Sequence, residues 1–262
     1  MPRRIGKATY EGNARTNLAG ILLARSELSA AAEELRRALR VHRTSGQRLS
    51  EWRSANQLTL IHLRRYEVEE ARTQADGALA LADDVGDLGA RAFARSTAGR
   101  VALAEDDVNR AAQGFECARE LATSGSHPIH LADALSGLAE VEERAGDIRE
   151  AIALHRLAVV SARQSARKYV DRCVLVGLAR ALGRDSQWNE ALDLLDDVRT
   201  GISARDDRRL GALTLGLRAE ALHERGEVKR AQEILVQAFD SMPSEETLAE
   251  RFLRTVSSRL RR

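Results

Sequence analysis

The sequence predicts an all-α protein, and three observations support this prediction. The 262 residues include only 18 glycines and three prolines, so residues that interrupt helices are sparse. Aromatic residues make up 3% of the chain against 44% hydrophobic residues, so its core must be built from alanine, leucine and valine. Apolar residues recur at spacings of three, four and seven, which places them on one face of a helix. We therefore expect a series of amphipathic helices.

A repeat of 40 residues organises these helices. Each repeat has a short loop followed by an alanine, which we call the anchor alanine, and each holds two helices, A before the loop and B after it. The six windows are 7–46, 47–86, 87–126, 127–166, 167–206 and 207–246. The anchors are Ala31, Ala71, Ala111, Ala151, Ala191 and Ala231.

Two further columns of small residues follow the same period. Small residues let helix axes approach closely, because the side chains at a crossing set the distance between the axes. Seven residues after the anchor stand Ala38, Ala78, Ala118, Ala158, Val198 and Ala238. Twelve residues before it stand Ala19, Thr59, Gly99, Ala139, Ala179 and Ala219.

These columns resemble the tetratricopeptide repeat, most plainly at Leu138-Ala139, at the segment 146–151 and at Ala158. The basic unit of that family is about 34 residues, so both helices here are expected to be about a turn longer. This longer form is similar to kinesin light chains and to sensor regions of bacterial regulators and signalling ATPases. HEAT or armadillo repeats also permit this period, but they explain the alanine columns less well. The resemblance implies a right-handed α-solenoid, with residues 1–262 as one superhelical domain.

The sequence at the C-terminal end predicts a capping helix over residues 244–262. Pro243 and the acids after it resemble a helix start, with Ser244 able to cap it. A terminal helix with a polar outer face is what a repeat array requires for solubility. Its apolar stripe consists of Leu248, Phe252, Leu253, Val256 and Leu260.

The N-terminal end carries no such cap. Gly6 aligns with Gly46 and Gly86, so the first repeat is expected to start at the beginning of the chain. Ile5, Tyr10 and Ala14 would then pack against a second copy of the chain or a missing domain. The first of these two alternatives is a homodimer through the first repeat.

Tests for catalytic and metal-binding motifs are negative. The sequence has no phosphate-binding G-x-x-x-x-G-K-[ST] loop, no H-E-x-x-H, no C-x-x-C and no EF-hand loop. His127 and His130 lack a third nearby ligand, and His155 is expected to be a buried, hydrogen-bonded residue of an apolar column. Cys117 and Cys173 are expected to be inert thiols. We therefore predict a non-enzyme with no catalytic residues, cofactor or metal.

Charge and composition exclude some classes of partner and indicate the cell compartment. Forty-one basic and 39 acidic residues leave a net charge of +2, too weak a field to attract nucleic acid. No apolar run approaches the roughly 18 residues of a membrane span, and the first residues do not resemble a secretory signal. Two cysteines without a disulfide pattern fit the cytoplasm. The preference for arginine over lysine is typical of a GC-rich bacterial genome.

The family resemblance implies that the A helices line a concave groove. Arginine recurs along the predicted groove, and a row of planar guanidinium groups suits carboxylates or peptide carbonyls. The alternative interpretation is that these are solvated surface charges. A carboxylate clamp of the family's lysine-asparagine kind is not expected, because no lysine stands in these columns. The candidate partner-binding residues are Arg53, Asn56, Arg64, Arg100, Glu140, Arg144, Arg180, Arg184 and Glu220.

Two functions remain open at this point. The first is a non-catalytic scaffold that binds a segment of a protein or peptide in the groove. The alternative is a ligand- or peptide-sensing regulatory domain of a bacterial transcription regulator or signalling ATPase. An enzyme is the least favoured class.

Overall fold

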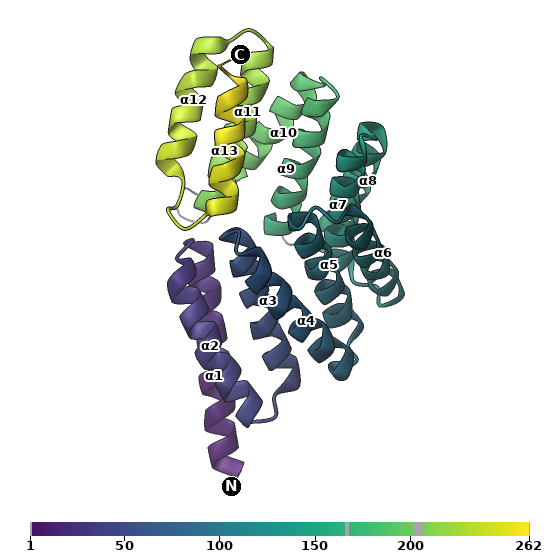
Figure 1. Cartoon of the computed structure of the whole chain (residues 1–262), viewed down its shortest axis with the longest axis vertical. Coiled ribbons are helices and arrows are strands. Elements are labelled where there is room, and N and C mark those ends of the chain that lie inside the picture. Colours follow the sequence, from purple (N-terminus) through teal and green to yellow (C-terminus); the bar gives the residue numbers. More distant parts are fainter. Residues whose placement is uncertain (1, 166–167, 202–206, 262) are drawn as a thin grey trace. The chain divides into compact units, whose positions relative to one another are not determined.

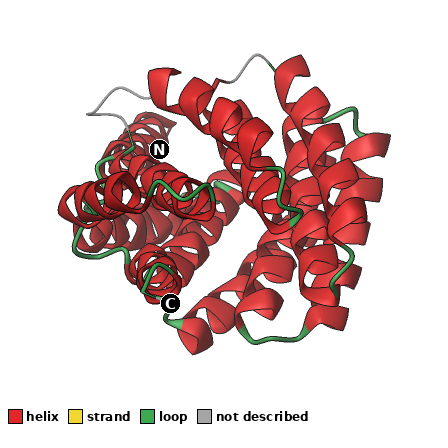
Figure 2. Cartoon of the chain, turned by 90° about the horizontal axis from the view of Figure 1, so that it is seen from above, coloured by secondary structure: helices red, strands yellow, loops and turns green. Residues whose placement is uncertain are grey.

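The computed structural model describes residues 2–165, 168–201 and 207–261, with side chains from Thr9 onward except at 168 and 169. Within these ranges all regular structure is helical (Figures 1 and 2). The predicted repeat boundaries at 166, 167 and 206 lie outside the described residues. The described helices are α1 (Pro2–Ala24), α2 (Leu28–Thr44), α3 (Arg48–Arg64), α4 (Val68–Val85), α5 (Leu88–Ala104), α6 (Val108–Ser124), α7 (Pro128–Ala145), α8 (Ile148–Gln164), α9 (Lys168–Arg184), α10 (Trp188–Gly201), α11 (Arg208–Glu224), α12 (Val228–Ser241) and α13 (Thr247–Arg259).

These helices form two compact units, Met1–His130 and Leu131–Arg262. In the first unit the two helices of each hairpin pack together, as α1 with α2, α3 with α4, and α5 with α6. Successive hairpins join through α2 against α3 and α4 against α5, and the A helices α3 and α5 also touch. The second unit repeats this scheme, with α9 packed on α8, α10 and α11, and α12 on α11. The predicted series of hairpins followed by a final helix is confirmed.

The three columns of small residues are buried, as predicted. The anchor alanines are at most 1% exposed, and the column from Ala38 to Ala238 is equally inaccessible. Gly99 shows why a small residue is needed: a Cβ there would lie 3.0 Å from the ring of Phe115, a fully buried side chain of α6. The small residues therefore create the room into which the neighbouring helix packs.

The turn between helices A and B is the same in every hairpin. The residue five positions before the anchor has a left-handed backbone in each case, with φ between 59° at Ser26 and 92° at Gly146. The next amide then donates back to helix A, as Glu27 N does to Leu22 O over 2.9 Å. This is the six-to-one hydrogen bond of a Schellman turn, which satisfies the last carbonyls of the helix.

Both ends of the chain differ from the prediction. Helix α1 begins at Pro2 and continues through Gly6, so residue 6 is not a turn as Gly46 and Gly86 are. Helix α13 begins at Thr247, and Glu246 rather than Ser244 occupies the N-cap position. The reason is a preceding turn, closed by Glu246 N donating to Pro243 O over 3.2 Å. The predicted stripe of α13 is buried at Leu253, Val256 and Leu260, whereas Leu248 is 45% exposed.

No helix in the described part of the chain is both long enough and apolar enough to span a membrane.

Candidate functional site

A buried carboxylate organises the predicted groove residues of the second unit. Glu143, on α7, is 3% exposed, and two arginines of α9 converge on it. Arg180 donates from Nη2 to Oε1 over 3.0 Å and from Nε to Oε2 over 3.2 Å. Arg184 places its Nε 3.4 Å from Oε2 and donates from Nη1 to the Glu143 main-chain oxygen over 3.3 Å. One carboxylate therefore holds two guanidinium groups in fixed positions.

Two further groups complete this cluster. His155 of α8 is 1% exposed, and its Nε2 lies 3.3 Å from Glu143 Oε1. The expectation that His155 is a buried, hydrogen-bonded histidine is confirmed. Gly177 of α9 makes room for the imidazole, since a Cβ there would lie 2.7 Å from His155 Cε1. Glu140, one turn before Glu143, lies 3.6 Å from Arg180 Nη2 and is 42% exposed.

Electrostatics keep Glu143 and Arg180 ionised. Burial alone would raise the pKa of Glu143, but the charges of Arg180 and Arg184 and the hydrogen bonds with His155 and Arg180 together lower it to about 2. Burial likewise opposes the charge of Arg180, yet Glu140 and Glu143 raise its pKa above the ordinary value for arginine. Despite these contacts with Glu143, the side chains of Arg180 and Arg184 stay 32% and 44% exposed.

Glu143 was missing from the predicted site, although the sequence contains a signal for it. Its column, eight residues before the anchor, holds Leu23, Leu63 and Leu103 in the preceding repeats. A single carboxylate in a leucine column requires a buried partner of opposite charge.

In the first unit, Arg64 binds the end of the preceding A helix. Its Nη1 and Nη2 lie 3.3 and 3.4 Å from the main-chain oxygen of Leu23, and Nη2 donates to Ser26 Oγ over 3.1 Å. Arg64 is half-buried in this position. The Leu23 oxygen already accepts from Ser26 N over 3.0 Å, so Arg64 adds a second donor at a helix C-terminus, where a cation is favourable.

The other predicted residues lie apart from these clusters. Arg53 is exposed, whereas Asn56 is 1% exposed and its side-chain nitrogen and oxygen have no hydrogen-bond partner among the described residues. Arg100 is half-buried and Arg144 exposed, and both interact with other residues of the chain. Glu220 of α11 pairs with Arg259 of α13. The structure therefore brings together Glu140, Arg180 and Arg184 around Glu143.

A second polar cluster, which the sequence did not predict, joins the first two hairpins. His42 of α2 is fully buried, with Nε2 3.2 Å from the Thr16 hydroxyl of α1. The same hydroxyl lies 3.2 Å from Ser54 Oγ of α3. Burial, and then the charge of Arg53, lower the pKa of His42, so the imidazole is neutral. A Cβ at Gly12 would lie 2.5 Å from His42 Cε1, so this cluster requires glycine there.

The histidine pair before the fourth repeat belongs to a row of rings. His127 and His130 have ring centroids 5.8 Å apart, and His130 stacks on Phe93 of α5 at 5.4 Å. Phe93 in turn meets Trp52 edge-on at 6.4 Å. Across the described residues no group of three or more histidine, cysteine or acidic side chains could hold a metal ion.

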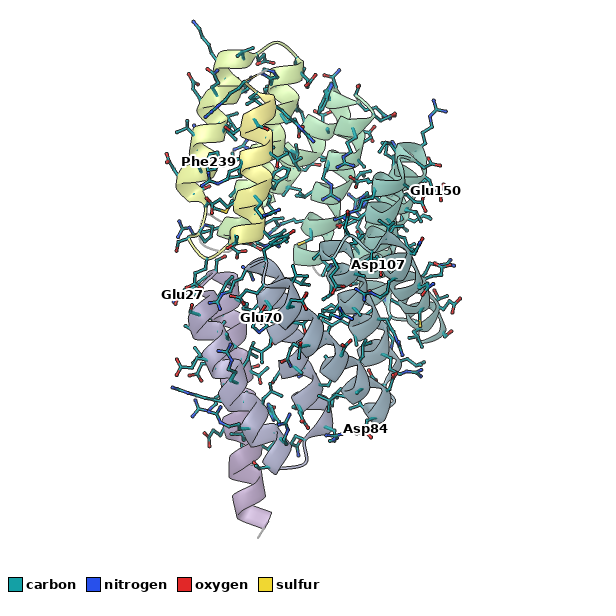
Figure 3. All side chains as sticks on the ribbon, viewed as in Figure 1. Glu27, Glu70, Asp84, Asp107, Glu150 and Phe239 are labelled. Carbon is teal, nitrogen blue, oxygen red and sulfur yellow. The ribbon has the colours of Figure 1, made fainter. Side chains whose placement is uncertain are left out.

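Charged side chains at helix starts also have structural roles. Asp107 caps α6 by accepting from Arg110 N over 3.0 Å, and Asp147 caps α8 by accepting from Glu150 N over 3.1 Å (Asp107 and Glu150 are labelled in Figure 3). Such caps satisfy amides that the helix leaves without partners.

Helix α1 exposes an apolar stripe. Tyr10 is 80% exposed, Leu18 45% and Ile21 54%, with exposed Ala14 between them. The same columns in the second repeat are buried, with Leu58 at 3% and Ile61 at 0%. The side chain of Ile5, predicted to belong to this surface, lies outside the described residues.

Comparison with known proteins shows the fold. No protein-family model matches the chain, and no curated protein matches its sequence. Among solved structures, a Rap protein complexed with Competence and Sporulation Factor aligns over 96% of this chain and 76% of its own, with a TM-score of 0.68 and 12% identity. The tetratricopeptide-like repeats of a kinesin light chain from Podospora anserina align over 72% and 93%, with a TM-score of 0.53 and 21% identity.

A third similar structure is a signal transduction ATPase with numerous domains from Pyrococcus horikoshii, which carries a tetratricopeptide repeat sensor. It covers 97% of this chain but only 40% of its own length, with a TM-score of 0.58 and 12% identity. Identities at this level establish the fold alone. The predicted tetratricopeptide-type fold is confirmed.

Proposed function

We propose that this chain, which has the tetratricopeptide-repeat fold, is a non-catalytic scaffold that binds a protein segment or peptide along its A helices. The supporting observation is the fixed pair Arg180 and Arg184. Glu143 holds both guanidinium groups, while the two side chains remain partly exposed to solvent. Groups fixed before binding lose little conformational entropy on contact with a partner.

The chemistry of this surface favours an extended segment with carboxylate or carbonyl oxygens. Arginine binds such oxygens through a planar fork of donors. In the second unit Arg144 of α7 adds an exposed positive group, and in the first unit Arg53 of α3 is an exposed positive group of an A helix. The proposal includes no nucleic acid, membrane or cofactor, and it places the protein in the cytoplasm, consistent with two cysteines that are not joined in a disulfide.

The experiment is a selection of binding peptides from a random-sequence display library, followed by measurement of dissociation constants. Arg53→Glu and Arg144→Glu reverse exposed charges on A helices, and Arg36→Glu and Arg149→Glu reverse exposed charges on the B helices α2 and α8. We expect the A-helix variants to weaken binding about tenfold or more, corresponding to at least roughly 1.4 kcal/mol. Equal effects of both pairs, or none, would contradict the proposal.

The alternative is a regulatory sensor, and two of the similar structures support it. One is a Rap protein complexed with Competence and Sporulation Factor, and the other contains a tetratricopeptide repeat sensor. A sensor must change conformation or assembly when its ligand binds. Small-angle scattering of the chain with and without a selected peptide separates the two functions, since a passive scaffold keeps its radius of gyration.

The exposed stripe on α1 supports a proposal about assembly. Tyr10, Ala14, Leu18 and Ile21 form an uncharged face, although charged residues make up 31% of the chain. Small Ala14 within the stripe would permit close approach of a second α1. We assign this face to a homodimer contact, in which the same patch of both copies meets across a two-fold axis.

A further inference from the structure

The first unit contains a cavity of about 300 Å³ between α4, α5 and α6. Its apolar lining comes from one or more residues of each helix, including Leu79 of α4 and Val101 of α5. Cys117 of α6 also borders the cavity and is half-buried. This volume is at the lower end of the range for small-molecule sites, so the cavity suits a compact ligand.

The cavity exists because three repeat columns carry unusually small residues at one place. Ala75, Ala98 and Gly114 all line it. At Ala75 and Ala98 a leucine would occupy this space, as leucine does elsewhere in the repeat array. At Gly114 an added Cβ would instead lie 3.2 Å from the main-chain oxygen of Arg95, so the glycine there allows α5 and α6 to approach closely. The column of Ala75 holds Leu35, Leu195 and Leu235, that of Ala98 holds Leu58, Leu138 and Leu178, and that of Gly114 holds Leu154 and Leu194.

The rim of the cavity is basic. Arg72, Arg95 and Arg110 line it, against a single acid, Asp76. Glu105 already binds two of these arginines: it lies 3.6 Å from Arg72 Nη1 and pairs with Arg110. The guanidinium of Arg95 makes fewer contacts with acids: among the described residues only its Nη2 donates to one, to Asp83 over 3.1 Å.

The Nε–H of Arg95 is buried and has no acceptor among the described residues. A buried donor without an acceptor costs free energy, so a rotation of the Arg95 side chain that lets a ligand oxygen accept from this N–H is favoured. An anionic oxygen makes the strongest such bond.

From this geometry we infer that the cavity binds a small organic carboxylate, with its apolar body against Ala75, Ala98 and Gly114 and its carboxylate toward Arg95. The site is independent of the A-helix surface proposed for peptide binding. Its position places Cys117 where a bound ligand shields the thiol.

The experiment measures the reaction of Cys117 with Ellman's reagent in a Cys173→Ser background, using benzoate as the probe. Benzoate at ten times its dissociation constant is expected to slow the reaction about tenfold, because only unliganded protein reacts. Benzamide, which has the same shape without the charge, is expected to protect much less. Titration calorimetry of benzoate repeats the comparison without relying on the thiol.

Matched variants test the two parts of the site. Arg95→Gln should abolish protection by benzoate, whereas Arg91→Gln should retain it, since Arg91 contacts the same Asp83 but does not line the cavity. Ala75→Leu, or Ala98→Leu if the first variant does not fold, should fill the cavity and abolish binding. Ala80→Leu is the control, an exposed position on the same helix α4.

The inference is overturned if benzoate neither protects Cys117 nor releases heat at millimolar concentration. It is also overturned if benzamide protects equally, or if Ala75→Leu or Ala98→Leu retains binding.

Discussion

Arg184 donates from Nη1 to the main-chain oxygen of Glu143 over 3.3 Å. Three repeats earlier, Arg64 makes the equivalent bond to Leu23 over the same distance. In both cases the arginine stands seven residues before its anchor, and the oxygen stands eight residues before the previous anchor. This column therefore joins consecutive A helices, and part of the predicted arginine row stabilises the array.

Replacing Arg64 tests this structural role. Arg64→Ala removes the bonds to Leu23 and Ser26, and we expect the free energy of unfolding to fall by about 1–2 kcal/mol, since each bond has a charged donor. Urea denaturation followed by circular dichroism measures this change. Arg36→Ala, an exposed arginine of α2, should change stability by less than about 0.5 kcal/mol. Equal stability of both variants would show that the Arg64 contact contributes nothing.

The pKa of Glu143 predicts how stability depends on pH. Its pKa is about 2 in the folded chain and near 4.5 when unfolded. Ionised Glu143 therefore stabilises the fold above about pH 4.5, and this contribution, roughly 3 kcal/mol, is lost as pH falls toward 2. Glu143→Gln should be less stable at neutral pH.

The measurement is the free energy of unfolding of both proteins between pH 2 and 7. The difference between wild type and Glu143→Gln should shrink as pH falls from 4.5 toward 2. Parallel stability curves would contradict a salt-bridged, ionised Glu143. Glu150→Gln, an exposed position on α8, serves as the control for the loss of one carboxylate.

The helices and their buried columns could be predicted because the repeat presents the same steric requirement six times. Ala31 and its equivalents are small for one reason, the close crossing of two helices. The repeated pattern of small residues was therefore enough to predict this crossing. Polar contacts in single repeats offer no such repetition. The burial of His155 followed from its column, but its bond to Glu143 depends on how α7 and α8 pack.

The sequence therefore predicted where the candidate residues stand in the repeat, but it did not predict which side chains contact one another. The columns placed Arg180 and Arg184 on an A helix, and a carboxylate in the column of Leu23, Leu63 and Leu103 indicated a buried charge at Glu143. The pattern did not indicate which arginines bind it. The error at Ser244 has a similar origin, because residues 243–246 form a turn before the helix starts. Local cap signals do not distinguish a turn from the first turn of a helix.

Gly12 and Gly20 provide a matched pair of substitutions on α1. Gly12→Ala would place a Cβ 2.5 Å from Cε1 of the fully buried His42, so we expect a loss of about 2 kcal/mol from overpacking. At Gly20 no atom lies within 4 Å of the added Cβ, so Gly20→Ala should stabilise the helix by up to about 1 kcal/mol. Thermal unfolding monitored by circular dichroism compares the two, and a stabilising Gly12→Ala would contradict the packing of His42 against α1.

The proposed homodimer is tested by sedimentation equilibrium at micromolar concentration. Wild type should sediment as a dimer, and Leu18→Glu should sediment as a folded monomer, because a charge in the α1 stripe would be buried without a partner in the contact. Val236→Glu is the matched control, since Val236 is 59% exposed but lies on α12. It should remain dimeric. A wild-type monomer, or equal dissociation of both variants, would show that a second copy of the chain does not cover Tyr10, Leu18 and Ile21.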